Sequence, residues 1–179
     1  INDEKVISDL IKSNKLDLLM HFAGFIQVEE SVQNPEKYFE NNTNNAIKLF
    51  NICKKNGLNK IVFSSTAAAY GSVIGNKLID EDTNLNPQNP YAESKIKTEK
   101  FLLKNQDDFK FIILRYFNVA GADKNLRSGQ ISKHSTHLIK ILSEVVVGKR
   151  DHIEIYGNDY DTPDGTAIRD YIHVSDLAD

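Results

Sequence analysis

The chain has 179 residues, of which 40% are hydrophobic and 26% are charged, and its formal net charge is -3. This length and composition fit a globular domain with a sizeable core and exclude a disordered or fibrous chain. The basic residues are scattered and do not cluster beside aromatic residues, which argues against a nucleic-acid binder. The most apolar stretch, LDLLMHFAGFIQV, falls short of the ~20 residues that a membrane-spanning helix requires.

The single cysteine, Cys53, and the two ends of the chain bear on where the protein works. One cysteine cannot form an intrachain disulfide, which fits a protein of the reducing cytoplasm. The sequence opens with Ile1 and stops at Asp179 within a helical pattern, so we expect a fragment of a longer protein. Any N-terminal targeting signal would then precede the sequence.

Helices and strands alternate along the first part of the chain. Apolar residues at helical spacing predict a helix from Asp3 to Asn14, and KLDLLMHF predicts a short buried strand before Gly24. After Pro35, an apolar stripe predicts one long helix that ends at Gly57. KIVFSS is the next predicted strand.

The alternation continues further along. A polar loop from Gly71 to Asn89 leads to a helix that runs from Pro90 to about Asn105. FKFIILRYF then predicts a strongly β-prone strand, and an irregular segment follows from Gly121 to Lys133. Beyond that segment the predicted elements are a helix in HLIKILSEVVVG, a strand in IEIYG and the beginning of a helix in HVSDLAD.

Strands that alternate with helices predict an α/β fold, here a doubly wound parallel sheet of the Rossmann type that is incomplete. Ligands bind at the carboxyl ends of such strands, where this sequence places HFAG, SSTAAAYG and LRYFNVAGA. The glycines, including Gly24, Gly57, Gly71 and Gly75, nowhere form the G-x-x-G-x-x-G or G-x-G-x-x-G turn that binds a pyrophosphate. If the fold binds a dinucleotide, we expect its phosphate loop to precede Ile1.

Tyr91 and Lys95 lie four residues apart at the beginning of a predicted helix. Residues at this spacing share a helix face, so the ammonium lies close to the phenol. A cation ~6 Å away contributes about 2.8 kcal/mol at an effective dielectric constant of 20, which lowers the pKa of a phenol by roughly two units. Tyr91 is therefore a candidate general base. The alternative is an amphipathic helix that carries both residues by chance.

Ser64, Ser65 and Thr66 end the predicted strand one β-α unit before the Tyr91 helix. A parallel sheet would bring these hydroxyl groups opposite that helix, where one of them could share a proton with Tyr91 and a substrate. The alternative is that these side chains cap the next element.

Asn42 falls in the apolar stripe of the predicted long helix, with Phe39, Ala46 and Leu49. An unsatisfied buried amide costs on the order of 1–3 kcal/mol, so a buried Asn42 needs a partner that the local sequence does not supply. The pattern leaves open that Asn42 instead faces solvent with the neighbouring asparagines.

The segment GNDYDTPDGTAIRDYIHVSDLAD surrounds Arg169 with glycine, aspartate, asparagine and threonine. Arginine suits bidentate phosphate binding, but the adjacent Asp170 offers a simple salt bridge instead. The histidines lack a metal-binding spacing and no cysteine cluster accompanies them, so we interpret them as structural or surface residues. They are His21, His134, His137, His152 and His173.

Together these stretches resemble the UDP-glucose 4-epimerases of the extended short-chain dehydrogenase/reductase superfamily. The similarity runs over essentially the whole chain, through HFAG, ESVQNPEKYFENN, FSSTAAAYG, NPYAESK, LRYFNVAGA and the segment around Arg169. It implies a bound NAD, the substrates UDP-glucose and UDP-galactose, and a homodimer of the full-length protein. It also implies that residues 1–120 are the C-terminal portion of an NAD-binding Rossmann domain. Residues 121–179 would be a partial nucleotide-sugar-binding region that returns to that domain.

The resemblance also implies individual roles. Tyr91 would be the base, Lys95 would lower the pKa of Tyr91 and hold the nicotinamide ribose, and Thr66 would share the proton with the substrate. The further cofactor-contacting positions are Phe22, Ala23, Gly24, Asn42, Ser64 and Phe117. The further substrate-binding positions are Asn118 and Arg169 at the UDP pyrophosphate, and His137 and Leu138 at the uridine.

In the implied reaction, Tyr91 takes the proton of the sugar 4-hydroxyl while hydride leaves C4 for NAD+. The hydride then returns to the opposite face of the 4-keto sugar. A 4,6-dehydratase or decarboxylase of the same superfamily is the nearest alternative, but dehydratases carry an Asp and a Glu where this chain has Ala67 and Ala68. A non-catalytic nucleotide-binding fragment is a third reading, although Tyr91 and Lys95 are both present. We expect the isolated fragment to be inactive.

Two positions depart from the pattern of the family. Ile26 stands where many members carry a lysine near the cofactor, so that contact is lost or replaced. Lys140 stands where a proline is common. Neither position alters the set of Tyr91, Lys95 and Thr66.

Overall fold

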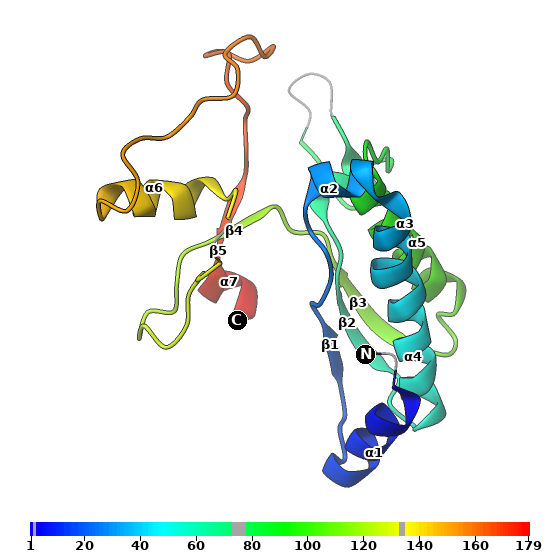
Figure 1. The fold of residues 1–179 in the computed structure, drawn as a ribbon. Helices are drawn as coiled ribbons and strands as arrows, with labels where there is room; N and C mark the ends of the chain where they lie inside the picture. Colours follow the sequence, from blue (N-terminus) through cyan, green and yellow to red (C-terminus); the bar gives the residue numbers. More distant parts are fainter. Residues whose placement is uncertain (2, 73–77, 133–134) are drawn as a thin grey trace. The chain divides into compact units, whose positions relative to one another are not determined.

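The computed structural model describes residues 1, 3–72, 78–132 and 135–179, so Gly75 and His134 lie outside the described residues. The chain divides into two compact units, Ile1–Arg115 and Tyr116–Asp179. Each unit contains parallel strands and helices (Figure 1). The predicted α/β class with parallel strands is therefore confirmed.

The first unit is built on a three-stranded parallel sheet with the strand order β1-β2-β3. Phe63 on β2 lies opposite His21 on β1 and Ile113 on β3. Alternate residues of a strand face opposite sides of the sheet, so Ile61 shares the face of Phe63 and Val62 lies on the other face. The strands are β1 Leu19–His21, β2 Lys60–Ser64 and β3 Lys110–Leu114.

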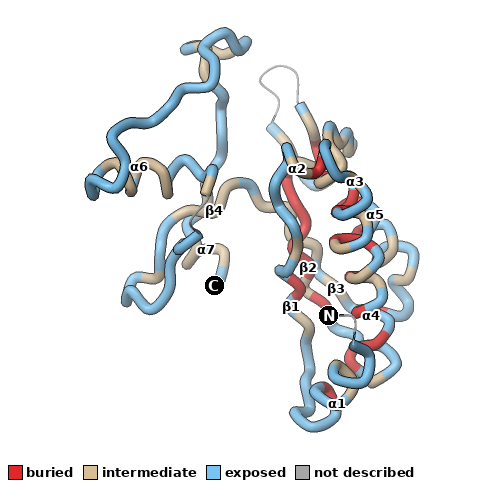
Figure 2. The backbone as a smooth tube through the Cα atoms, viewed as in Figure 1, coloured by how far each residue is buried: buried red, intermediate tan, exposed pale blue. Residues whose placement is uncertain are grey.

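Helices α4 and α5 cover one face of this sheet (Figure 1). Phe50 of α4 and Leu102 of α5 pack there with Ile61 and Phe63 in a buried core (Figure 2). The helices of this unit are α1 Glu4–Asn14, α2 Val28–Gln33, α3 Pro35–Tyr38, the π-helix η1 Phe39–Asn44, α4 Asn45–Lys55, the 3-10 helix η2 Ala67–Tyr70 and α5 Pro90–Lys104.

The beginning of α5 is fixed by its own sequence. The side chain of Asn89 accepts a hydrogen bond from the N–H of Ala92 at 2.9 Å, which satisfies a donor of the first turn. Pro90 supplies the helical φ at the first position and has no N–H that would need a partner. Tyr91 consequently stands in the first turn of a 15-residue helix, as the sequence predicts.

Two predicted elements of the first unit differ from the structure. The single long helix expected from Pro35 to Gly57 is instead three successive helices, α3, η1 and α4. A π-helix changes the hydrogen-bonding register over one turn, and side-chain periodicity does not reveal that change. The strand predicted through FKFIILRYF ends at Leu114, and the side chain of Arg115 beyond it forms an ion pair with Glu99.

The second unit holds a parallel strand pair, β4 Asn118–Ala120 and β5 Tyr171–His173, with the helices α6 Leu138–Val146 and α7 Val174–Ala178. Both helices were predicted, and both strands were missed because three residues give too short a pattern. The strand predicted in IEIYG is wrong. Ile155 is 73% exposed and Tyr156 is 82% exposed, and no described strand pairs with this segment.

Candidate functional site

Lys95 is buried at the carboxyl end of β2. Its side chain is 3% exposed, and its ammonium donates a hydrogen bond to the carbonyl oxygen of Ser64 at 2.9 Å. The nitrogen also lies 5.2 Å from the centroid of the Phe63 ring. Burial lowers the pKa of Lys95 from 10.5 to about 8, so the ammonium is mostly charged at pH 7. In the part of the chain that the structure describes, no carboxylate forms an ion pair with it.

Tyr91 stands one helical turn before Lys95, as the sequence predicts. It is half-buried, and its ring meets the ring of Tyr38 edge to face, with centroids 6.4 Å apart. The backbone carbonyl of Tyr91 accepts a hydrogen bond from the Ser94 hydroxyl at 2.7 Å, which holds the first turn of α5. The helix therefore carries a partly exposed phenol and a buried ammonium on consecutive turns.

Of the hydroxyl groups that follow β2, that of Ser65 contacts α5 and that of Thr66 contacts η2. The Ser65 hydroxyl donates a hydrogen bond to the carboxylate of Glu99 on α5. Thr66 is 8% exposed, and its hydroxyl accepts a hydrogen bond from the N–H of Ala68 at 3.1 Å at the beginning of η2. Thr66 is thus a cap, as the alternative interpretation held, and the described contacts use its hydroxyl as an acceptor only. The hydroxyl proton remains able to donate to a ligand.

Asn42 is 1% exposed, so the question that the sequence left open is answered in favour of burial. Its Oδ1 accepts a hydrogen bond from the N–H of Phe25 at 2.9 Å, and its Nδ2 donates to the carbonyl of Phe25 at 2.9 Å. Nδ2 also lies 3.3 Å from the hydroxyl of Ser94. The partners that the local sequence does not supply are the loop after β1 and helix α5. The π-helix η1 aims the amide at both of them.

Gly24, in the loop after β1, lies tightly between these two side chains. A Cβ atom at this position would come within 3.1 Å of Asn42 Oδ1 and 3.2 Å of Lys95 Nζ. A larger residue would therefore press on the buried ammonium. Phe22, which is 44% exposed, and Ala23 stand beside it at the surface of the unit. The first unit thus brings Gly24, Asn42 and Lys95 together.

His21, at the end of β1, is a packing residue. It is 4% exposed, stacks on Phe63 with ring centroids 6.0 Å apart, and meets Phe50 edge to face at 5.5 Å. Burial, and then the charge of Lys95, lower the pKa of His21 from 6.5 to about 4. The imidazole is consequently neutral at pH 7.

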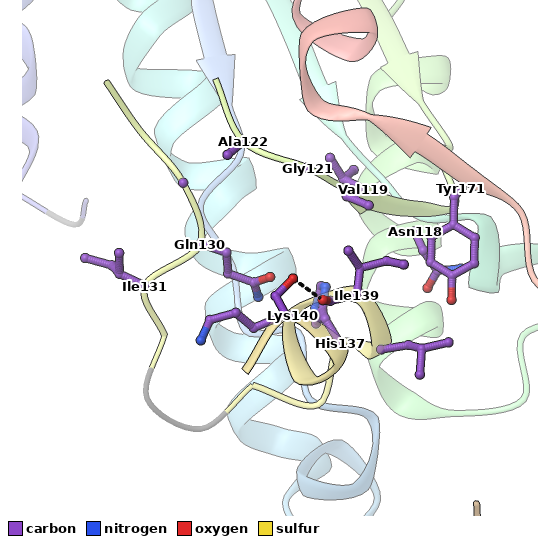
Figure 3. A pocket seen from close by; sticks show the side chains of 14 residues that line it. Asn118, Val119, Gly121, Ala122, Gln130, Ile131, His137, Ile139, Lys140 and Tyr171 are labelled. Atoms are coloured by element: carbon purple, nitrogen blue, oxygen red, sulfur yellow. Dashed lines mark hydrogen bonds between the residues drawn. The ribbon is translucent and has the colours of Figure 1, made fainter. Parts of the chain in front are cut away.

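The second unit contains a pocket of about 380 Å³ beside its strand pair. Figure 3 shows Asn118 and Tyr171, from the two strands, on one side of the pocket and Gln130 and Ile131 on the other. Of the predicted substrate-binding residues, three line it. The lining residues are Asn118, Val119, Ala120, Gly121, Ala122, Gly129, Gln130, Ile131, His137, Leu138, Ile139, Lys140, Ser143 and Tyr171.

The strand pair positions Asn118 at this pocket. Its Nδ2 donates a hydrogen bond to the carbonyl of Asp170 at 2.9 Å, and its N–H donates to the same carbonyl at 3.3 Å. Phe117, which is 40% exposed, and Arg169, which is exposed, are not among the residues that line it. Of the two residues predicted to hold a pyrophosphate, Asn118 thus lines the pocket and Arg169 does not.

Sequence reasoning gave no pocket role to Gln130, Lys140 or Tyr171. Lys140 forms an ion pair with Glu144, which also accepts a hydrogen bond from Arg150 at 2.8 Å. Hydrogen bonds from these two cations lower the pKa of Glu144. Membership of a pocket depends on which distant segments pack together, so no local pattern in the sequence signals it. Among the described residues, no group of three or more His, Cys, Asp or Glu side chains could hold a metal ion.

The sequence profile of the NAD dependent epimerase/dehydratase family matches residues 1–179. A UDP-glucose 4-epimerase from Azospirillum brasilense is 48% identical over 100% of this chain and 52% of its own length. One from Lacticaseibacillus casei is 44% identical over 100% of this chain and 54% of its own length. The chain thus spans about half the length of the curated relatives that it matches. None of its described helices is both long enough and apolar enough to cross a bilayer.

Solved structures give the same result. The crystal structure of UDP-glucose 4-epimerase from Bifidobacterium longum in complex with NAD+ and UDP has a TM-score of 0.91 and 38% identity. The match covers 99% of this chain and 54% of that chain. The UDP-Glc/GlcNAc 4-epimerase from Campylobacter jejuni has a TM-score of 0.75 and 45% identity, with 99% and 54% covered.

Proposed function

The chain belongs to the NAD dependent epimerase/dehydratase family. We propose that it is part of a UDP-glucose 4-epimerase, an enzyme that interconverts UDP-glucose and UDP-galactose. The observation that carries the proposal is the match to UDP-glucose 4-epimerases along the entire chain, at 48% and 44% identity. The arrangement of Tyr91, Lys95 and Thr66 at the end of a parallel strand supports it independently.

The residues of the first unit fit a bound NAD. Lys95 is a buried cation that donates a hydrogen bond to the carbonyl of Ser64, and an ammonium has three N–H donors. Ribose hydroxyl groups suit the remaining donors, because they accept hydrogen bonds and need no further charge. In this proposal the first unit holds the cofactor through Phe22, Ala23, Gly24, Asn42, Ser64, Tyr91 and Lys95. Phe117, which belongs to the second unit, is a further proposed cofactor contact. NAD supplies the acceptance and return of hydride at C4 of the sugar when it is bound.

Tyr91 is the proposed base for the proton of the sugar 4-hydroxyl. The ammonium of Lys95 lies one turn further along α5 and is held by the carbonyl of Ser64 on β2. Its positive charge favours the phenolate form of Tyr91 over the phenol. Thr66 contributes a hydroxyl that can both donate and accept, so it can pass the proton between the sugar and Tyr91. The same groups return the proton when the hydride comes back to the opposite face of C4.

The proposed substrate contacts other than Thr66 come from the second unit. Asn118 and Arg169 would hold the UDP pyrophosphate, and His137 and Leu138 would line the uridine site. Asn118, His137 and Leu138 border the pocket in Figure 3, which supports this part of the proposal. The neighbour from Bifidobacterium longum was solved with UDP as well as NAD+.

A nucleotide-sugar 4,6-dehydratase or decarboxylase is disfavoured. Elimination of water needs an acid and a base beside the sugar, and the residues after Thr66 are Ala67 and Ala68 in η2. Neither side chain can move a proton. A non-catalytic nucleotide-binding role is disfavoured because Tyr91, the proposed base, and Lys95 are both present on consecutive turns of α5.

The proposal also includes the domain boundaries, the oligomeric state of the protein and its cellular compartment. Residues 1–120 would belong to the NAD-binding domain and residues 121–179 to the nucleotide-sugar-binding region. A cytoplasmic protein fits the buried thiol of Cys53, which would stay reduced there. The proposed homodimer of the full-length protein rests on the resemblance to the family alone. Because the chain spans about half of its relatives' length, we expect these 179 residues alone to be inactive.

The decisive experiment uses the protein with its full natural chain. The purified protein is incubated with UDP-galactose, UDP-glucose and UDP-N-acetylglucosamine, and the products are identified by proton NMR. We expect UDP-galactose and UDP-glucose to interconvert without added NAD. A 4-keto-6-deoxy sugar product would instead establish a dehydratase, and bound NAD with no conversion of any sugar would contradict the proposal.

A further inference from the structure

Glu99 is a buried carboxylate to which the proposed reaction gives no role. It lies on α5 one turn after Lys95 and is 1% exposed. Arg115 Nε lies 3.1 Å from each of its oxygens, and Arg115 Nη2 donates to Oε2 at 2.6 Å. The hydrogen bonds that Arg115 donates to Glu99 raise the pKa of Arg115 above its ordinary value. The two side chains thus form a tightly hydrogen-bonded ion pair between the end of β3 and the middle of α5.

This pair reaches both ends of the segment that carries Thr66. At the beginning of the segment, the hydroxyl of Ser65 donates to Oε1 of Glu99. At its end, Arg115 Nη1 donates to the hydroxyl of Tyr70 at 3.1 Å, and the guanidinium carbon lies 5.3 Å from the centroid of the Tyr70 ring. In the chain, Thr66 therefore lies between Ser65, which binds Glu99, and Tyr70, which binds Arg115.

The same contact reaches Lys95 through the backbone. Ser64, whose carbonyl accepts from the ammonium of Lys95, is the neighbour of Ser65, whose hydroxyl binds Glu99. Lys95 and Glu99 are i and i+4 on α5, so successive turns of the helix hold successive residues of the strand end. A shift of Ser65 would therefore move the carbonyl that fixes Lys95.

Stability alone does not explain such a pair. A buried ion pair loses the hydration of both ions, and apolar residues of similar volume often replace it without loss of stability. Positioning is the role that remains for an ion pair whose two further partners, Ser65 and Tyr70, lie on either side of Thr66 in the chain.

We propose that Glu99 and Arg115 are positioning residues that fix Thr66 and Lys95 in the geometry that proton transfer requires. This inference rests on the proposed epimerase function. Neither side chain contacts the reacting atoms in this proposal. They act through Ser65 and Tyr70, which hold the segment from 65 to 70 against α5.

The test compares Ser65→Ala and Glu99→Gln in the protein with its full natural chain. Ser65→Ala removes one hydroxyl and leaves the ion pair intact, so it should fold even if Glu99→Gln does not. The rate of conversion of UDP-galactose is measured per bound NAD, because a partly unfolded preparation would then keep the wild-type value. Glu93→Gln is the matched control, since Glu93 lies on the same helix in an exposed pair with Lys97 at 3.3 Å.

We expect kcat per bound NAD to fall about 10-fold in Ser65→Ala and about 100-fold in Glu99→Gln, because a misplacement of the order of 1 Å is enough for such losses. The KM for UDP-galactose should change less than about 2-fold, since every proposed substrate contact except Thr66 lies outside the segment that the pair holds. Wild-type kcat per bound NAD in both variants would overturn the inference while leaving the proposed function intact.

Hydrogen exchange separates failure of this inference from failure of the proposed function. Exchange in the peptide that spans residues 65–71 should become at least about 10-fold faster in Glu99→Gln and stay unchanged in Glu93→Gln. If the wild-type protein does not epimerise UDP-galactose, the function fails, and faster exchange still supports the positioning role. Unchanged exchange in Glu99→Gln would overturn the positioning role whether or not the wild-type protein is active.

Discussion

The two units of the chain build their candidate sites in opposite ways. In the first unit the polar groups of the site are buried, with Asn42, Lys95 and Thr66 exposed by 1%, 3% and 8%. In the second unit, no residue that the structure describes from Tyr116 onward is buried, and His137 and Arg169 are exposed (Figure 2). The site of the first unit is therefore held by side chains, and that of the second by a strand pair and a half-exposed helix.

This difference teaches which parts are preorganised. Buried side chains with several hydrogen bonds each have one arrangement, as proton transfer requires. Residues that line an exposed pocket become ordered when a ligand binds, and the free energy needed to deform such a pocket is small. We infer that substitutions in the first unit change the rate and the global stability, whereas those in the second change local order and affinity.

The largest expected effect is that of Tyr91→Phe. Loss of the phenol hydroxyl removes the proposed base, and a general base contributes about 100- to 10,000-fold to a rate. The ring contact with Tyr38 survives in phenylalanine, so the fold and the bound NAD should be retained. The measurement is kcat for UDP-galactose in the full natural chain, with the NAD content of the same sample. Activity within about 10-fold of wild type would assign the base to another group.

Phe50→Ala tests whether substitutions in the first unit lower the unfolding free energy more than substitutions in the second unit do. Phe50 is 0% exposed and packs against both His21 and Phe63, so truncation should cost about 3–5 kcal/mol of unfolding free energy. Leu142→Ala on α6 is the counterpart in the second unit, where the leucine is only half-buried, and it should cost less than about 2 kcal/mol. Guanidinium denaturation followed by fluorescence gives both values. Equal losses of unfolding free energy in the two variants would mean that the core of the second unit contributes as much stability as that of the first.

Lys95→Met separates the role of the ammonium in the reaction from the stability that its burial costs the folded protein. Burial lowers the pKa of Lys95 from 10.5 to about 8, so between pH 8 and 10.5 the unfolded chain binds more protons than the folded chain. Stability attributable to this residue therefore rises with pH across that window, by about 2–3 kcal/mol from pH 7 to pH 10. The methionine variant lacks this rise and should be inactive at every pH.

Unfolding free energies of the wild type and Lys95→Met, measured at pH 7 and at pH 10, give the comparison. The difference between the two proteins should shift by about 2–3 kcal/mol in favour of the wild type as the pH increases. Lys97→Met on the exposed face of α5 is the control, and its pH dependence should match the wild type. A pH-independent difference for Lys95→Met would mean that the lysine is not desolvated.

The sequence predicted most of the first unit because its signals are local. Pro90 and the i, i+4 spacing together indicate where Tyr91 and Lys95 stand, and the structure adds the cap at Asn89. The apolar periodicity also gave the three strands of the sheet. The resemblance to UDP-glucose 4-epimerases is likewise confirmed by the comparisons.

What the sequence could not predict depends on partners distant in the chain. The backbone of Phe25 satisfies Asn42, which lies in the π-helix η1, and no composition signals either the distant partner or the register change. Glu99 and Arg115 are 16 residues apart and meet through the packing of a strand against a helix. In the second unit, β4 and β5 lie about 50 residues apart and are short, so neither has a pattern that indicates its partner.

The smallest effect, and the most local, is expected from Gly121→Ala beside the pocket of the second unit. Gly121 has a φ of +91, and a Cβ atom there would come within 2.2 Å of Nε2 of His173. The imidazole would have to leave its place, where its Nδ1 accepts a hydrogen bond from the N–H of Ser175 at 3.2 Å and begins α7. Together with the backbone strain, this should cost about 1–3 kcal/mol within the unit.

Gly148→Ala is a control of equal backbone strain for this substitution. Gly148 has a φ of +72, and no atom lies within 4 Å of its Cβ position, so alanine there strains the backbone without a collision. Hydrogen exchange in the peptides that contain residues 118–120 and 171–173 should accelerate in Gly121→Ala and not in Gly148→Ala. The affinity for UDP should fall only in the former. If Gly121→Ala left both exchange and affinity unchanged, contacts other than that between Gly121 and His173 would hold the strand pair.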